Sequence, residues 1–112
     1  MTSTVARATQ TVTINSGALL STDMDLRNTE AVGIAAPVLT SGQLFLQVGM
    51  NSGTYVGRLH DPRSQAAWFW NVAAGSAAII VDAPIRPFTH AAIEVANSQA
   101  ALRTFTIAKA RG

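Results

Sequence analysis

Apolar and polar residues alternate along much of this chain, and turn-forming residues interrupt the alternation at short intervals. Between Gln43 and Met50, the leucines, the valine and the methionine fall on one side, whereas Phe45 falls on the other. Successive side chains of a β-strand point to opposite faces, so this pattern predicts a strand with one buried face. The turn formers at residues 51–53 (Asn-Ser-Gly) then predict a hairpin, with residues 54–60 as the returning strand.

Similar alternation predicts about eight short strands in all, with turns roughly every 8 to 12 residues. No helical pattern exceeds two turns. This spacing predicts an all-β fold, an antiparallel two-sheet β-sandwich with jelly-roll-like connections. Residues 23–28 fit either a short strand or a loop. The strands are expected at residues 10–15, 30–36, 43–50, 54–60, 68–72, 77–81, 91–96 and 103–109.

The chain divides into a short polar start and one domain. Residues 1–9 carry small and polar side chains without a helical stripe, so we expect either a flexible N-terminal arm or a disordered terminus. As an extended arm these residues would reach about 30 Å, far enough to touch a neighbouring subunit. Residues 10–112 are expected to form a single β-sandwich domain around one hydrophobic core.

Charged residues make up only 12% of the chain, and the formal net charge is +2. A typical domain has about 25%, so the surface is weakly charged, which suggests that a partner covers part of it. The few cations are scattered, which argues against nucleic-acid binding. Neither a membrane-spanning segment nor a Sec signal peptide is indicated, and without cysteine the fold must be held by packing.

Candidate catalytic or metal-binding residues are few. His60 and His90 are the only histidines, and a zinc site would need further ligands beside them. Asp23 and Asp25, with Asn28 and Glu30, could offer oxygens to Ca²⁺, but the glycine and distal glutamate of a calcium loop are missing, which favours a solvated loop. No serine lies in a nucleophile elbow and no carboxylates are paired. We therefore expect no enzyme activity, no metal and no cofactor.

The densest aromatic group is Trp68-Phe69-Trp70. In a strand the two tryptophans share a face, and we expect that face to be the core. Phe69 and Phe45 would then point outward, where exposed aromatic side chains favour protein contacts. Replacing either phenylalanine by serine is expected to leave the monomer folded and to weaken assembly. The predicted subunit-contact residues are Phe45, Phe69, Arg58 and Arg63.

Five segments of the chain resemble small virion structural proteins of tailed bacteriophages. They are Ser21–Pro37 (STDMDLRNTEAVGIAAP), Gly42–Tyr55 (GQLFLQVGMNSGTY), Val72–Gly75 (VAAG), Asp82–Pro84 (DAP) and Ala101–Ala108 (ALRTFTIA). The resemblance implies a non-enzymatic β-sandwich carried in many copies on a phage-like particle, as a head decoration or cement protein or a tail-associated component. The implied partners are the major capsid protein, other virion subunits and further copies of the chain.

The implied location is the virion, on the capsid surface rather than the tail, after assembly in the host cytoplasm. Bulky aromatics at Trp68 and Trp70 replace the β-branched residues usual in that family. A different class of function is a carbohydrate-binding β-sandwich on a tail or fibre, since sugar rings stack on exposed aromatics flanked by polar groups. Asn51 and Tyr55, near Arg58, or an outward-facing Trp68, would make those contacts. A third reading is a tail-completion or adaptor ring subunit.

Overall fold

The computed structural model describes residues 6–27, 29, 31–37, 39, 43–60, 63–71, 77–81 and 88–111. Within these ranges the chain forms nine β-strands and no helix, and hence contains no helix that could cross a membrane. The strands are β1 (Ala6–Ile14), β2 (Met24–Asp25), β3 (Ala31–Ala36), β4 (Gln43–Gly49), β5 (Gly57–Arg58), β6 (Trp70–Asn71), β7 (Ala77–Val81), β8 (His90–Val95) and β9 (Arg103–Arg111).

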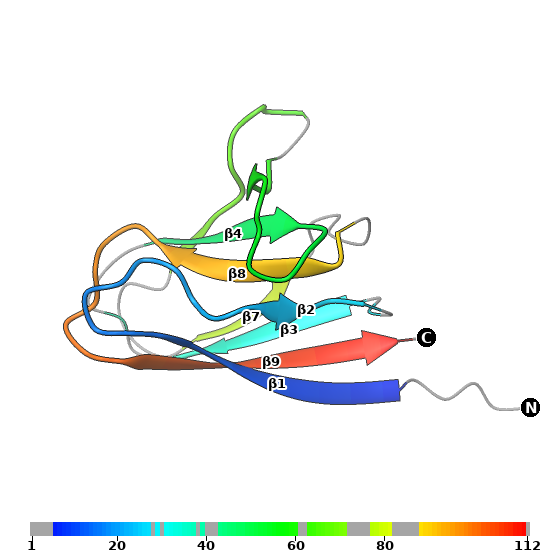
Figure 1. Ribbon diagram of the computed structural model, residues 1–112, viewed down its shortest axis with the longest axis horizontal. Coiled ribbons are helices and arrows are strands. Elements are labelled where there is room, and N and C mark those ends of the chain that lie inside the picture. Colours follow the sequence, from blue (N-terminus) through cyan, green and yellow to red (C-terminus); the bar gives the residue numbers. More distant parts are fainter. Residues whose placement is uncertain are drawn as a thin grey trace, which may run out of the picture.

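The strands form two antiparallel sheets that lie in two layers (Figure 1). The four-stranded sheet has the order β1-β9-β3-β7, and the five-stranded sheet has the order β2-β8-β4-β5, with β6 also paired to β4. Consecutive strands from β1 to β4 therefore alternate between the two sheets. The predicted antiparallel two-sheet β-sandwich is confirmed.

Inward-facing residues of both sheets make up the core, as the alternation predicts. In the long pairing of β1 with β9, Val12 lies opposite Phe105, and on the other side of β9, Ile34 lies opposite Ile107. All four side chains are at most 2% exposed. The five-stranded sheet contributes inward-facing side chains from alternate positions of β4 and β8, namely Leu44, Leu46, Val48, Ala91, Ile93 and Val95.

Polar side chains connect the two sheets at one edge of the sandwich. Gln10 of β1 donates from Nε2 to the carbonyl oxygen of Asp23 over 2.8 Å, and its Oε1 accepts the backbone N–H of Asp25. Lys109 of β9 donates from Nζ to the same Gln10 oxygen and to the carbonyl oxygen of Asp25. The segment that contains β2 is thereby held against the β1–β9 pair, with its backbone groups satisfied.

Several boundaries differ from the sequence-based expectation. Residues 6–9, expected in a flexible arm, belong to β1 and pair with the end of β9, where Ala6 lies opposite Arg111. Backbone hydrogen bonds alone extend this pairing, so it needs no apolar pattern. Of the described residues in the expected strands 54–60 and 68–72, only the two-residue strands β5 and β6 pair with β4, and both share one of its edges.

Some predicted features lie outside the described residues. They are the start of the arm at residues 1–5, the turn residues Asp61 and Pro62, Asn28, Glu30, and the segments Val72–Gly75 and Asp82–Pro84. The hairpin at residues 51–53 is present, since Asn51 bridges to Thr54 and Gly53 adopts a φ of 74°.

Candidate functional site: two outer faces and an aromatic pocket

The outer face of the five-stranded sheet carries a cluster built on Phe45. The guanidinium carbon of Arg58 lies 3.8 Å from the centre of the Phe45 ring, and the Phe69 ring lies 6.3 Å away, tilted by 49°. Arg58 also donates from Nε and Nη2 to the two carboxylate oxygens of Glu94, at 2.8 and 2.9 Å. Gln47 donates a further bond of 2.9 Å to Glu94. These contacts hold the Arg58 guanidinium flat against Phe45.

Electrostatics within this cluster favour the charged forms of both partners. Hydrogen bonds from Arg58 lower the pKa of Glu94. Burial acts in the opposite direction, and the hydrogen bond from Gln47 lowers the pKa further. The hydrogen bond to Glu94 likewise raises the pKa of Arg58. A planar guanidinium that is paired to a carboxylate and stacked on a ring is well ordered, so the surface that it presents is rigid.

The four predicted subunit-contact residues differ in exposure. Phe45 lies outside the core cluster, as expected, but it is only 7% exposed, so the expectation that its ring points freely into solvent is wrong, while its contact with a neighbour stays a prediction. Phe69 and Arg58 cover the Phe45 ring. Arg58 lies in β5 and Phe69 directly precedes β6, and both strands pair with β4. Phe69 itself is 49% exposed. Arg58 and Arg63 are also exposed.

The predicted sugar-contact residues differ in their surroundings. Asn51 is exposed in the hairpin turn. The Tyr55 hydroxyl instead donates to Asp23 Oδ1 over 2.6 Å, and His90 Nδ1 lies 2.8 Å from Asp23 Oδ2. Burial raises the pKa of Tyr55, and its hydrogen bond to Asp23 raises it further. Arg58 is occupied by Glu94 and Phe45.

The Asp23–Tyr55–His90 cluster connects the hairpin after β4 to β8. Burial would raise the pKa of Asp23, but hydrogen bonds from Tyr55 and His90 outweigh it and lower the pKa. Asp25, the other proposed calcium ligand, is bound by Arg27 through Nε–Oδ1 and Nη2–Oδ2 contacts of 3.0 and 2.8 Å, and these hydrogen bonds lower its pKa.

Of the possible metal ligands, Asp23 and His90 contact each other, whereas Asp25 is paired with Arg27. His60 Nδ1 lies 2.7 Å from the carbonyl oxygen of Arg58. Among the described residues, no group of three or more His, Cys, Asp or Glu side chains comes together.

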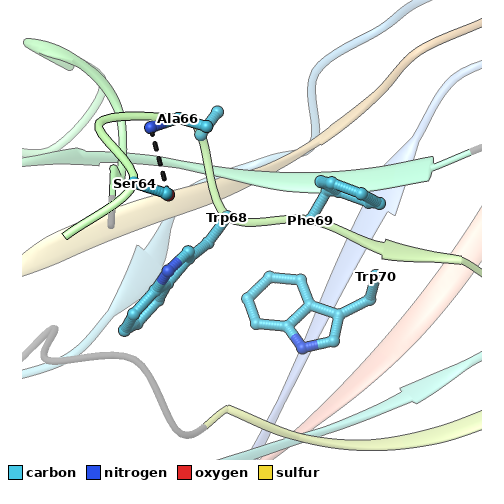
Figure 2. Close-up of a pocket in the computed structure, with 6 residues that line it drawn as sticks. Ser64, Ala66, Trp68, Phe69 and Trp70 are labelled. Atoms are coloured by element: carbon cyan, nitrogen blue, oxygen red, sulfur yellow. Dashed lines mark hydrogen bonds between the residues drawn. The ribbon is translucent and has the colours of Figure 1, made fainter. Parts of the chain in front are cut away.

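Trp68 and Trp70 lie where the sequence predicts, on the inner face of their strand. Both are partly buried and pack against the core. Together with the turn before them they line a pocket of about 440 Å³ at the free edge of the five-stranded sheet. Figure 2 shows both indoles on one side of this segment, with the Phe69 ring on the other side. The pocket-lining residues are Ser64, Ala66, Ala67, Trp68, Phe69 and Trp70.

The outer face of the four-stranded sheet is uncharged across its described side chains. We call it the Thr/Ala face. Thr11 lies opposite Thr106, which in turn lies opposite Ala35 of β3. Alternation predicts these small residues on the solvent-facing side of each strand, but it does not indicate which strands pair to bring them together in one face. Its members are Thr9, Thr11, Thr13, Gly33, Ala35, Thr104, Thr106 and Ala108.

Comparison with known proteins supports the fold more than the function. No protein-family model matches the sequence, and no curated protein matches it. Among solved structures, the chain is similar to the SPBc2 prophage-derived protein YomS, with a TM-score of 0.63 at 8% identity, over 98% of this chain and 97% of that chain.

A second solved structure comes from work titled "Bacillus endospore appendages form a novel family of disulfide-linked pili". The TM-score is 0.46 at 15% identity, over 97% of this chain and 90% of that chain, which is too low to carry an argument. At 8% identity the likeness to YomS shows the fold alone. A prophage-derived neighbour agrees loosely with the resemblance to phage virion proteins, whereas membership of that family is not shown.

Proposed function

We propose that this chain is a non-enzymatic structural protein of a tailed phage or phage-like particle, and specifically a decoration or cement protein bound in many copies to the capsid surface. Its partners in this proposal are the major capsid protein and neighbouring copies of itself. The prophage origin of a protein with the same fold supports the phage setting.

The observation that carries the proposal is the Thr/Ala face. Thr11, Thr106 and Ala108 are exposed there, and no charged side chain interrupts the described part of the face. The centres of protein interfaces are depleted of charged residues, because burying an unpaired charge is costly. Small side chains also let another subunit approach the sheet closely.

The size of this face suits a lattice better than an isolated pair. Three strands about 4.8 Å apart, with about five residues each at 3.4 Å, cover roughly 250 Å². A stable pairwise interface needs about 800 Å² from each partner. Contact through this face alone would be weak, and many weak contacts in a repeating array add up to firm attachment.

The strand order gives further support. The two sheets have the orders β1-β9-β3-β7 and β2-β8-β4-β5, with strands β1 to β4 alternating between them and β6 added at the β4 edge, which is compatible with the jelly-roll-like connections that we propose. Viral capsid proteins commonly use that architecture, although lectins and cupins use it too. On the opposite side of the molecule, Phe69 and Arg58 offer a second contact region, supported by Phe45 beneath them.

The experiment compares particles assembled with wild-type protein, without it, and with Thr106→Lys. We expect particles that lack the protein to lose resistance to heat and low salt, and the lysine variant to fold normally but bind particles weakly. Thr54→Lys, in the exposed hairpin, is the matched control and should bind like wild type. Equal stability of particles with and without the protein would show that it is not a cement protein.

A further inference from the structure

Both tryptophans of the chain lie in the pocket at the edge of the five-stranded sheet. Neither indole N–H has a hydrogen-bond partner among the described residues. Every buried side-chain nitrogen or oxygen among these residues does have a partner. The two donors of Trp68 and Trp70 therefore reach solvent. Indole N–H groups usually have a hydrogen-bond partner when they are buried, so these two solvent-reaching donors are available to a ligand that enters the pocket.

The remaining lining defines what kind of acceptor would fit. Ser64 accepts only a long bond of 3.4 Å from the backbone N–H of Ala66, which leaves its hydroxyl hydrogen available. Ala66 and Ala67 keep the pocket open, and none of the described lining residues carries a charge. A charged ligand would lose hydration without gaining a partner of opposite charge.

Aromatic faces combined with a few neutral donors suit a molecule that has an apolar ring face and hydroxyl oxygens around its rim. We propose that the pocket lined by Ser64, Trp68 and Trp70 binds a neutral pyranose sugar. The C–H face of the ring stacks on an indole, and ring hydroxyls accept from the indole N–H groups and Ser64. This proposal is independent of capsid attachment, since it concerns the isolated chain.

The dimensions agree with a small saccharide. A volume of about 440 Å³ falls within the range of roughly 300–1,000 Å³ that is typical of small-molecule sites. Trp68 and Trp70 are two residues apart on one side of an extended segment, which separates their Cα atoms by about 7 Å. A saccharide of one or two rings spans that separation.

The test uses the indole N–H resonances of the isotopically labelled protein, because the two tryptophans give one such signal each. Glucose, galactose, N-acetylglucosamine and maltose are titrated separately into the low millimolar range and above. We expect at least one sugar to shift both indole signals in a saturable manner. Trp70→Phe keeps the packing but removes a donor, and should weaken binding about tenfold. Ser64→Ala should weaken it less.

Ser52→Ala is the matched control, since Ser52 is an exposed turn serine at a distance in the hairpin, and it should leave binding unchanged. Failure of all four sugars to shift either indole signal overturns the proposal. Indole signals that shift with protein concentration in the absence of sugar would also overturn the proposal. They would show that a second copy of the chain occupies the pocket. Equal weakening by Ser52→Ala and Ser64→Ala would place the sugar elsewhere.

Discussion

Replacing Phe45 by alanine should destabilise the monomer strongly, although Phe45 lies on the outer face of its sheet. The ring is 7% exposed, because Arg58 and Phe69 cover it. A buried phenylalanine removes about 150 Å² from water, which at about 25 cal/mol per Å² corresponds to about 4 kcal/mol. Alanine retains part of that burial, so we expect the free energy of unfolding to fall by about 3 kcal/mol.

Phe69→Ala is the matched control, because Phe69 belongs to the same cluster but is 49% exposed. About half as much apolar surface is buried as at Phe45, so we expect the free energy of unfolding to fall by about 1.5 kcal/mol. Urea unfolding followed by far-UV circular dichroism measures both variants, at low protein concentration so that assembly does not add to stability. The double variant should lose less than the two single losses together, because each ring contacts the other.

Similar small losses for Phe45→Ala and Phe69→Ala, each below about 1 kcal/mol, would refute this reasoning. They would mean that Phe45 is not covered in solution and that it is available to a neighbour, as its position in the strand alone suggests. The result therefore decides whether Phe45 acts as a support for Phe69 and Arg58 or as a contact residue.

Three further predictions concern stability. In Gly49→Ala the added Cβ would overlap the carbonyl oxygen of Thr54, so the melting temperature should fall, as measured by scanning calorimetry. Gln10→Ala removes the amide that connects the two sheets and should cost about 1–3 kcal/mol in urea unfolding; a loss within error would show that solvent replaces these bonds. Folding lowers the pKa of Glu94 from 4.5. The stabilisation that ionised Glu94 contributes is therefore complete above pH 4.5, and it is lost as the pH falls through the lower pKa of the folded state. The stability difference between wild type and Glu94→Gln should therefore shrink between pH 5 and pH 3, and a constant difference would contradict the assigned ion pair.

Much of the sandwich could be predicted because its core obeys local alternation. The inward positions of β4, β8 and β9, including Ile93 and Phe105, follow from every second residue being apolar. The extension of β1 over residues 6–9 could not be predicted this way. That pairing depends on the backbone of β9, and a polar, small sequence carries no sign of it.

The candidate sites depend on contacts between distant segments, which limits what the sequence can predict. Trp68 and Trp70 were expected on one face, and the structure adds Ser64 and a free sheet edge beside them. The burial of Phe45 requires Arg58, which lies on a strand with its own pairing to β4. Tyr55 is 32 residues from Asp23, and His90 is 67 residues from it, so no local pattern links them.

The pairing of Ala6 with Arg111 places the start of β1 beside the finish of β9. A tag, epitope or reporter protein fused before β1 or after β9 would lie at the same end of the molecule. A short linker could also close the chain into a ring, with fresh termini opened in the loop at residues 97–102 at the far pole. The molecule is thus suited to carrying a fused protein at one end, while the outer faces of both sheets stay uncovered.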